Sequence, residues 1–155
     1  MPEPALVRSL TTLVGDTASF YLQAHAAHWN VEAPNFAELH KFFGKLYEDV
    51  HEALDPLAEY LRTHAAEAPC SLKSMIEAST IPAEFDGHET PTGGYLGIDL
   101  LTHLSRLNQA YLKQLNSTYS AATSAGDLGL ANFLQERMTA HRRWMWQLRS
   151  FTERG

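Results

Sequence analysis

The chain has 155 residues and a mass of 17.3 kDa, enough for one domain with a sizeable core and too little for two. Its composition, 45% hydrophobic and 19% charged, excludes a disordered chain, and no apolar run approaches the ~20 residues that span a bilayer. A net charge of −6 opposes general binding to phosphate backbones, and the single cysteine, Cys70, excludes an internal disulfide. The start shows no secretory leader, so we expect a reducing, cytoplasmic setting.

Leucine and alanine dominate the chain while valine and isoleucine are scarce, which favours helices over strands. Glycine and proline divide it into four long helical stretches and one short one. The expected helices are 5–31, 36–64, 70–79, 96–124 and 128–152. Residues 80–95 form a long connection, whereas the other two connections between long helices are short. We therefore predict an all-α fold in one domain, 1–155: a ferritin-like four-helix bundle whose long crossover carries a short extra helix.

Ligand-type side chains follow one flank of the second long helix, beside its apolar face. They are His40, His51, Asp55 and Glu59. A di-iron site inside a single bundle needs a Glu-x-x-His sequence on each of two helices, and this chain has only one, which ends at His51. The spacing therefore disfavours a metal site within the bundle.

Two histidines flank the short turn at 33–35, where an antiparallel hairpin brings His28 and His40 level with each other. Asp55 follows His40 by fifteen residues, about 22 Å along a helix, so the two cannot share a metal within one chain. Asp55 and Glu59 form a second half-site at i and i+4. If two chains pack antiparallel through this flank, the halves combine into two identical sites suited to Fe(II), Mn(II) or Zn(II).

Each of these residues also has a simpler interpretation. His28 and His40 can be helix-end histidines with hydrogen-bonded rings. Asp55 and Glu59 can belong to a solvated helix face, and Trp29 can be a core aromatic residue.

Three motifs stand out: His28-Trp29-Asn30-Val31, Asn35-Phe36-x-x-x-His40-x-x-Phe43 and Asp55-x-x-Ala58-Glu59. Together with the last helix after Ala125-Gly126-Asp127, they give the chain a resemblance to the Dps mini-ferritins over nearly its whole length.

The resemblance implies a homo-oligomeric cage of twelve subunits, with ferroxidase centres at two-fold interfaces. In such a centre His28 and His40 of one subunit and Asp55 and Glu59 of its partner bind iron, for which zinc is a possible substitute. Fe(II) is oxidised by hydrogen peroxide or O2, and the ferric mineral is stored inside, which protects against oxidative damage. Trp29 takes the place of an aromatic electron donor beside the centre.

The main departure from the family is Gly44, because the family usually has an aspartate four residues after its second histidine. The loss of this carboxylate should weaken or remove the second iron position. We hypothesise that His25 fills the vacated space and supplies a neutral ligand. His51 either extends the partner's half-site or only forms hydrogen bonds near it. The alternative function is a cage with an incomplete centre, which binds metal without rapid turnover.

Further expectations concern partners and the iron route. Twelve chains of charge −6 carry −72, and the ends of the sequence offer no lysine-rich tail, so we expect neither strong DNA binding nor a membrane partner. Asp127 is a candidate for an acidic pore. Glu48, Asp49 and Glu52 are candidates for nucleating mineral, or a solvated face.

Overall fold

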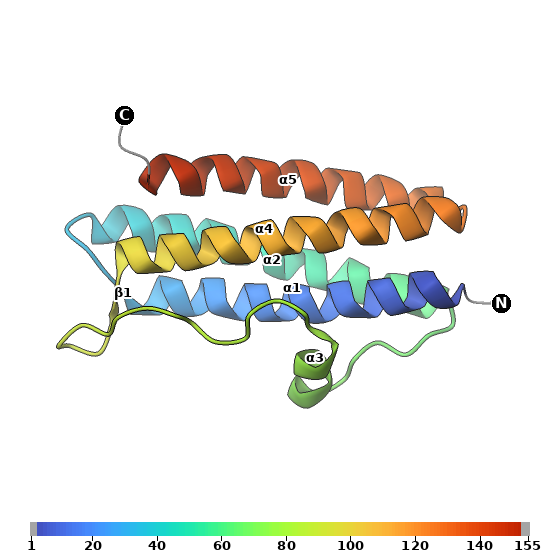
Figure 1. The fold of residues 1–155 in the computed structure, drawn as a ribbon, viewed down its shortest axis with the longest axis horizontal. Helices are drawn as coiled ribbons and strands as arrows, with labels where there is room; N and C mark the ends of the chain where they lie inside the picture. The colour runs from blue at the N-terminus through green and yellow to red at the C-terminus, as the bar shows by residue number, and fades with distance from the viewer. Residues whose placement is uncertain (1–2, 153–155) are drawn as a thin grey trace.

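Four long helices form a bundle in the computed structural model, which describes residues 3–152 (Figure 1). The predicted domain of 1–155 also includes residues 1, 2 and 153–155, which lie outside the described residues. The helices are α1 (Pro4–Asn30), α2 (Phe36–Thr63), α3 (Leu72–Ala78), α4 (Gly97–Ser124) and α5 (Leu128–Thr152). The all-α, ferritin-like fold predicted from the sequence is confirmed, and the long helices begin and end within a residue or two of the expected positions.

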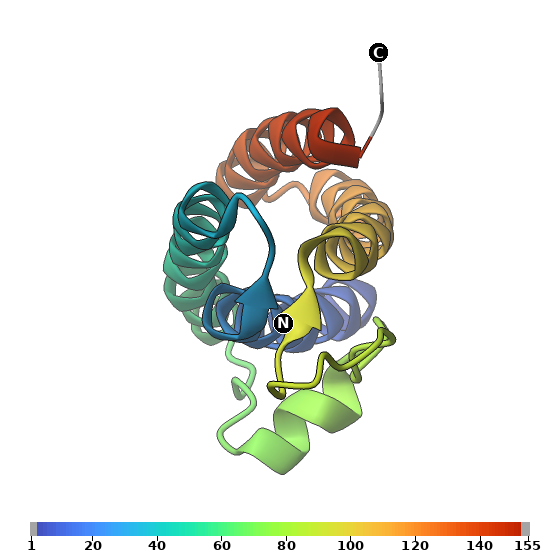
Figure 2. The same ribbon diagram turned by 90° about the vertical axis from the view of Figure 1, so that its left-hand side faces the viewer.

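The four long helices surround a core of leucine and aromatic side chains. Viewed from one end, α1, α2, α4 and α5 enclose the centre, and α3 lies outside the bundle beneath α1 (Figure 2). The largest fully buried side chains include Phe20 on α1, Phe43 on α2 and Tyr111 on α4. Helices α1 and α2 pack along each other as an antiparallel hairpin, and this pair carries the predicted metal ligands.

A small parallel pairing at one end of the bundle was not expected from the strand-poor composition. Strand β1 (Val31–Glu32) follows α1 directly and pairs with β2 (Tyr95–Leu96), which precedes α4. Each strand has only two residues, and strand propensities cannot indicate so short a strand in a sequence. The pairing joins the α1–α2 turn to the end of the crossover and so fixes where α2 begins.

The crossover is held to α1 by one buried carboxylate. Asp16 accepts hydrogen bonds from the hydroxyls of Ser79 and Thr80 and from the backbone N–H groups of Thr80 (2.6 Å) and Ile81 (3.2 Å). Beside it, a Cβ on Gly15 would lie 2.8 Å from the carbonyl oxygen of Met75, so only glycine lets α3 approach α1 this closely. These contacts keep the crossover on the side of α1 away from the bundle interior.

Candidate metal centre

His28 and His40 hold each other through reciprocal hydrogen bonds. Nδ1–H of His28 donates to the carbonyl of His40 (2.6 Å), and Nδ1–H of His40 donates to the carbonyl of His28 (2.7 Å). The rings stack with centroids 3.7 Å apart and 18° between planes. Because a carbonyl only accepts, each Nδ1 must carry the proton. Nε2 is therefore the nitrogen of each ring that is available to bind a metal.

The backbone explains why the pair forms at this place. The carbonyl of His28 belongs to the last turn of α1, where carbonyl groups have no helical partner, and His40 supplies one. On α2, a Cβ at Gly44 would lie 3.3 Å from both Cε1 and Nδ1 of His28. The glycine therefore leaves room for the His28 ring to lie close against α2.

The space beside Gly44 is bounded by His28 and Tyr47, the side chains nearest to a Cβ built at position 44. His25, the residue expected to fill this space, instead stacks on Tyr47 (centroids 3.8 Å, planes 6° apart). His28 and Tyr47 thus occupy the position next to Gly44. The role of His25 as a metal ligand remains a prediction.

Asp55 and Glu59 lie farther along α2, and both are exposed. Neither forms a hydrogen bond or an ion pair within residues 3–152. The helix continues through Pro56 to Thr63, so the two carboxylates occupy successive turns of one helix. No group of three or more histidine, cysteine or carboxylate side chains in the described chain is close enough to hold a metal ion. The two histidines and the two carboxylates thus do not meet within the described part of one chain.

Five ring side chains continue from the histidine pair along the α1–α2 surface. We call Trp29, His25, Tyr47, Tyr21 and His51 the aromatic row. His25 lies 4.1 Å from Trp29, and Tyr21 lies 4.6 Å from His51, measured between ring centroids. Trp29 is 59% exposed rather than part of the core.

His25 contacts three other members of the aromatic row, Trp29, Tyr47 and Tyr21, and its pKa is shifted. Its Nδ1 lies 2.9 Å from the hydroxyl of Tyr21. Partial burial lowers the pKa of His25 below its usual value, and the neighbouring His28 and His51 lower it further. His25 is thus held in its neutral form near neutral pH. His51 is exposed, and its ring packs on Tyr21.

Comparison with known proteins gives the family. Residues 8–155 match the model of the ferritin-like domain. The chain belongs to the ferritin-like family. The DNA protection during starvation protein of Brevibacillus brevis is 25% identical over 144 residues, which is 93% of this chain and 92% of that protein.

Solved structures agree with this placement. Dps from Staphylococcus aureus superposes with a TM-score of 0.88 at 24% identity, covering 99% of both chains. The DPS protein of Vibrio cholerae O1, described as a member of a superfamily of ferritin-like diiron-carboxylate proteins, superposes with a TM-score of 0.86. It is 24% identical and covers 96% of this chain and 89% of its own. Within the ferritin-like family, this chain is thus similar in sequence and in fold to Dps proteins.

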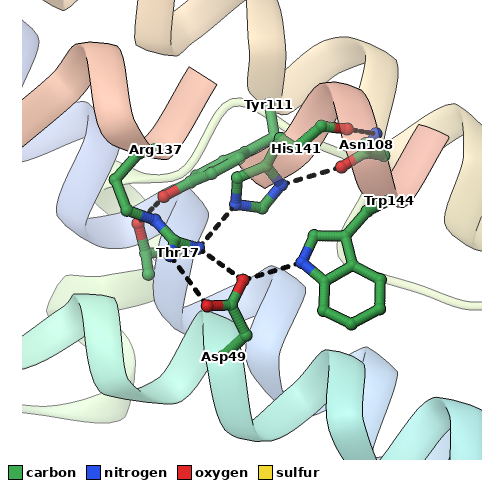
Figure 3. A network of polar contacts seen from close by, with 7 residues as sticks. All are labelled: Thr17, Asp49, Asn108, Tyr111, Arg137, His141 and Trp144. Atoms are coloured by element: carbon green, nitrogen blue, oxygen red, sulfur yellow. Dashed lines mark hydrogen bonds and ion pairs between the residues drawn. The ribbon is translucent and has the colours of Figure 1, made fainter. Parts of the chain in front are cut away.

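The interior of the bundle holds an ion pair between α2 and α5 (Figure 3). Arg137 donates from two nitrogens to the carboxylate of Asp49, at 2.9 and 3.0 Å, and Trp144 donates from Nε1 to the same carboxylate at 2.7 Å. Burial would raise the pKa of Asp49, but the hydrogen bonds from Arg137 and Trp144 and the charge of Arg137 outweigh it and lower the pKa. Asp49 thus forms an ion pair within the bundle rather than belonging to a fully solvated face, and its candidate role in nucleating mineral remains a prediction.

The network extends across the core to α4. Arg137 also donates to Nε2 of His141 (2.9 Å), so the proton of this ring sits on Nδ1, which donates to Asn108 (2.8 Å). Burial lowers the pKa of His141 to about 3, and the charge of Arg137 acts in the same direction. Next to it, Tyr111 and Thr17 share a hydrogen bond of 2.6 Å, and burial raises the pKa of Tyr111 to about 12. The guanidinium and its fixed partners leave this interior unsuited to a second cation.

Asp127, the candidate pore residue, has structural partners. Its carboxylate accepts from the backbone N–H of Leu130 (3.0 Å), which caps the start of α5, and lies 2.7 Å from Nε2 of His64. A pore role for Asp127 must therefore be compatible with these two contacts.

Tyr21 and Tyr47 are the residues near the site that the sequence patterns did not single out. Tyr47 recurs at helical spacing with the apolar residues of α2, which is typical of a core residue, and Tyr21 belongs to no motif. The one sequence signal was the four-residue spacing of Tyr21 and His25, which puts them on the same face of α1.

Proposed function

We propose that this protein is a mini-ferritin that oxidises Fe(II) at centres shared between two subunits and stores the ferric product in a twelve-subunit cage. His28 and His40 bind iron from one subunit, and Asp55 and Glu59 bind it from the partner. The observation that carries the proposal is the reciprocal Nδ1 anchoring of His28 and His40, which leaves Nε2 of each ring as the nitrogen available to iron. The unpaired carboxylates of Asp55 and Glu59 supply the oxygen ligands that ferrous iron also accepts.

The chemistry follows from this ligand set. Carboxylates stabilise Fe(III) over Fe(II), so iron bound between neutral imidazoles and carboxylates is readily oxidised, with hydrogen peroxide or O2 as the acceptor. Removing Fe(II) and peroxide together suppresses hydroxyl-radical formation and protects against oxidative damage. Trp29, exposed beside the pair, is proposed as an electron donor to the centre, and His25 and His51 as residues that extend it.

Gly44 supports a second candidate function. Without a carboxylate at this position, a cage of the same architecture binds one metal per centre, such as iron or zinc, and turns over slowly. The two functions differ in the rate of peroxide-driven oxidation and in the mineral retained. Net charge favours protection through iron chemistry over tight DNA coating in either case.

No helix in the described part of the chain combines the length and apolar character needed to cross a membrane. We propose that the cage works in the cytoplasm, the reducing setting expected from the cysteine content.

The decisive test is complementation between two inactive variants. His28→Ala removes one half-site and Asp55→Asn the other, so each variant alone should lose peroxide-driven oxidation. When the two chains are co-expressed, half of the two-fold pairs are mixed, and each mixed pair has one intact centre. About one quarter of the wild-type oxidation should therefore return.

Glu38→Gln serves as the control because Glu38 is exposed on the same helix, in its first turn. It should keep full activity. Co-assembled chains that stay inactive, or single variants that keep oxidising iron, would show that the centre is not shared between subunits. Storage is tested separately, by loading the protein with Fe(II) and peroxide and asking whether ferric absorbance elutes with a cage-sized particle.

A further inference from the structure

Tyr21 is hydrogen-bonded to a histidine and packed within the aromatic row, next to the proposed centre. Its hydroxyl lies 2.9 Å from Nδ1 of His25, and its ring centroid lies 6.2 Å from that of Tyr47. Tyr47 in turn lies 5.3 Å from His28, again between centroids. Two ring contacts thus connect Tyr21 to a proposed iron ligand.

A phenol in this arrangement is a good one-electron donor. A free tyrosine must form a high-energy radical cation or lose its proton to water when it is oxidised. When the hydroxyl points at an imidazole nitrogen, the proton crosses the hydrogen bond as the electron leaves. Nδ1 of His25, 2.9 Å from the hydroxyl, is the nitrogen placed to accept that proton.

The proposed iron centre needs an electron besides the one that a single Fe(II) supplies. Reduction of hydrogen peroxide to water takes two electrons, and one Fe(II) supplies one. Gly44 removes the carboxylate that family members use near a second iron, and the space beside it is bounded by His28 and Tyr47. A centre with one iron must obtain the second electron elsewhere, or release a hydroxyl radical.

We propose that Tyr21 supplies this second electron through Tyr47. The proposal rests on the proposed ferroxidase function. In the balanced step, Fe(II), tyrosine, neutral His25, hydrogen peroxide and two protons from solvent give Fe(III), a tyrosyl radical, protonated His25 and two waters. The O–O bond breaks, iron and Tyr21 are each oxidised by one electron, and the phenolic proton moves to Nδ1 of His25.

The first experiment loads one Fe(II) per centre, mixes it with hydrogen peroxide and freezes the sample for electron paramagnetic resonance. Wild-type protein should give a tyrosyl radical that changes shape when the tyrosines are ring-deuterated, with one iron oxidised per peroxide. Tyr21→Phe keeps the ring but removes the hydroxyl, so it should lose the radical and consume two irons per peroxide, a twofold change. Tyr119→Phe is the control, since the Tyr119 hydroxyl accepts from Gln135 and contacts no histidine.

Two results would overturn the proposal. One is a wild type that oxidises two irons per peroxide without a radical, as expected if His25 is a ligand for a second iron. The other is a radical of unchanged yield in Tyr21→Phe, or one assigned to tryptophan, which would move the donor role to Trp29.

A second experiment needs no iron, so it separates this proposal from the ferroxidase proposal. Photogenerated ruthenium(III) tris-bipyridine oxidises the metal-free protein, and the tyrosyl radical yield is measured by transient absorption. Tyr21→Phe should lower the yield severalfold relative to Tyr119→Phe. A wild type that fails to oxidise iron but shows this difference would refute the ferroxidase function alone, whereas equal yields in both variants would refute the donor role of Tyr21.

Discussion

Asp49→Asn removes the negative charge from the ion pair inside the bundle while keeping the size of the side chain. Arg137 is 9% exposed and loses its counter-charge, and Nε of Arg137 is already buried without a hydrogen-bond partner within the described residues. Asparagine keeps only one acceptor oxygen, so at least one of the three hydrogen bonds that the carboxylate now accepts is lost. The substitution therefore leaves a buried cation that is incompletely paired.

The size of the effect follows from this geometry. Removing one partner of a buried ion pair costs about 3–5 kcal/mol. The side chain of Asp49 is 30% exposed, so water reaches it and the lower end applies, about 3 kcal/mol. For a chain of this length that is a fall of roughly 6–12 °C in the melting temperature.

Denaturant unfolding of the assembled protein at fixed subunit concentration measures the loss, with Glu48→Gln as control. Glu48 is the neighbouring residue and is exposed, so its substitution should change the free energy of unfolding by less than about 0.5 kcal/mol. The double variant Asp49→Leu with Arg137→Met should recover much of the loss, because it removes both charges.

The same variant tests where iron binds. Asp49→Asn should keep the iron stoichiometry of the wild type, since the proposed ligands lie elsewhere. A loss of stability below about 1 kcal/mol would refute the account of the ion pair. Loss of iron binding by a folded, assembled Asp49→Asn protein would refute the placement of the centre at the subunit interface.

Three further predictions concern stability. Asp16→Ala leaves two backbone amides of the crossover without an acceptor and should lower the free energy of unfolding by about 2–4 kcal/mol in urea titrations, whereas the exposed Glu77→Gln should have almost no effect. Burial lowers the pKa of His141 to about 3 from 6.5, so the unfolded chain binds an extra proton between these values and stability falls with falling pH, by about 2 kcal/mol from pH 7 to pH 5. His141→Gln should lack this loss, and an unchanged pH slope would contradict it. Asp127→Ala removes the cap of α5 and should cost about 1 kcal/mol, which a urea midpoint equal to wild type would disprove.

The helices could be read from the sequence because local rules decide them. Glycine and proline mark the ends of the helical stretches, and leucine repeats at helical spacing between them. The same local rules placed His28 and His40 level across the α1–α2 turn, since both lie about one turn from it. Helix rise also separates Asp55 from His40, so the spacing of these residues is enough to require a second chain.

The contacts of particular side chains could not be read in this way. Glu48, Asp49 and Glu52 are equivalent by sequence, yet only Asp49 is drawn into the bundle. Its partner Arg137 lies on α5, 88 residues away, and is brought there only when α5 packs against the bundle. The angle of a carboxylate around its helix decides whether it faces the bundle or solvent. A helical wheel drawn from one helix cannot show which side chains of other helices that carboxylate meets.

The sequence by itself thus determined the helices, their connections and the separation of the two half-sites, because these depend on residues near one another in the chain. Only the tertiary structure decided the tautomer of the histidine pair, the room that Gly44 leaves for His28 and the hydrogen bond of Tyr21 with His25. These depend on distances of a few ångströms between side chains of two helices, which are set by close packing.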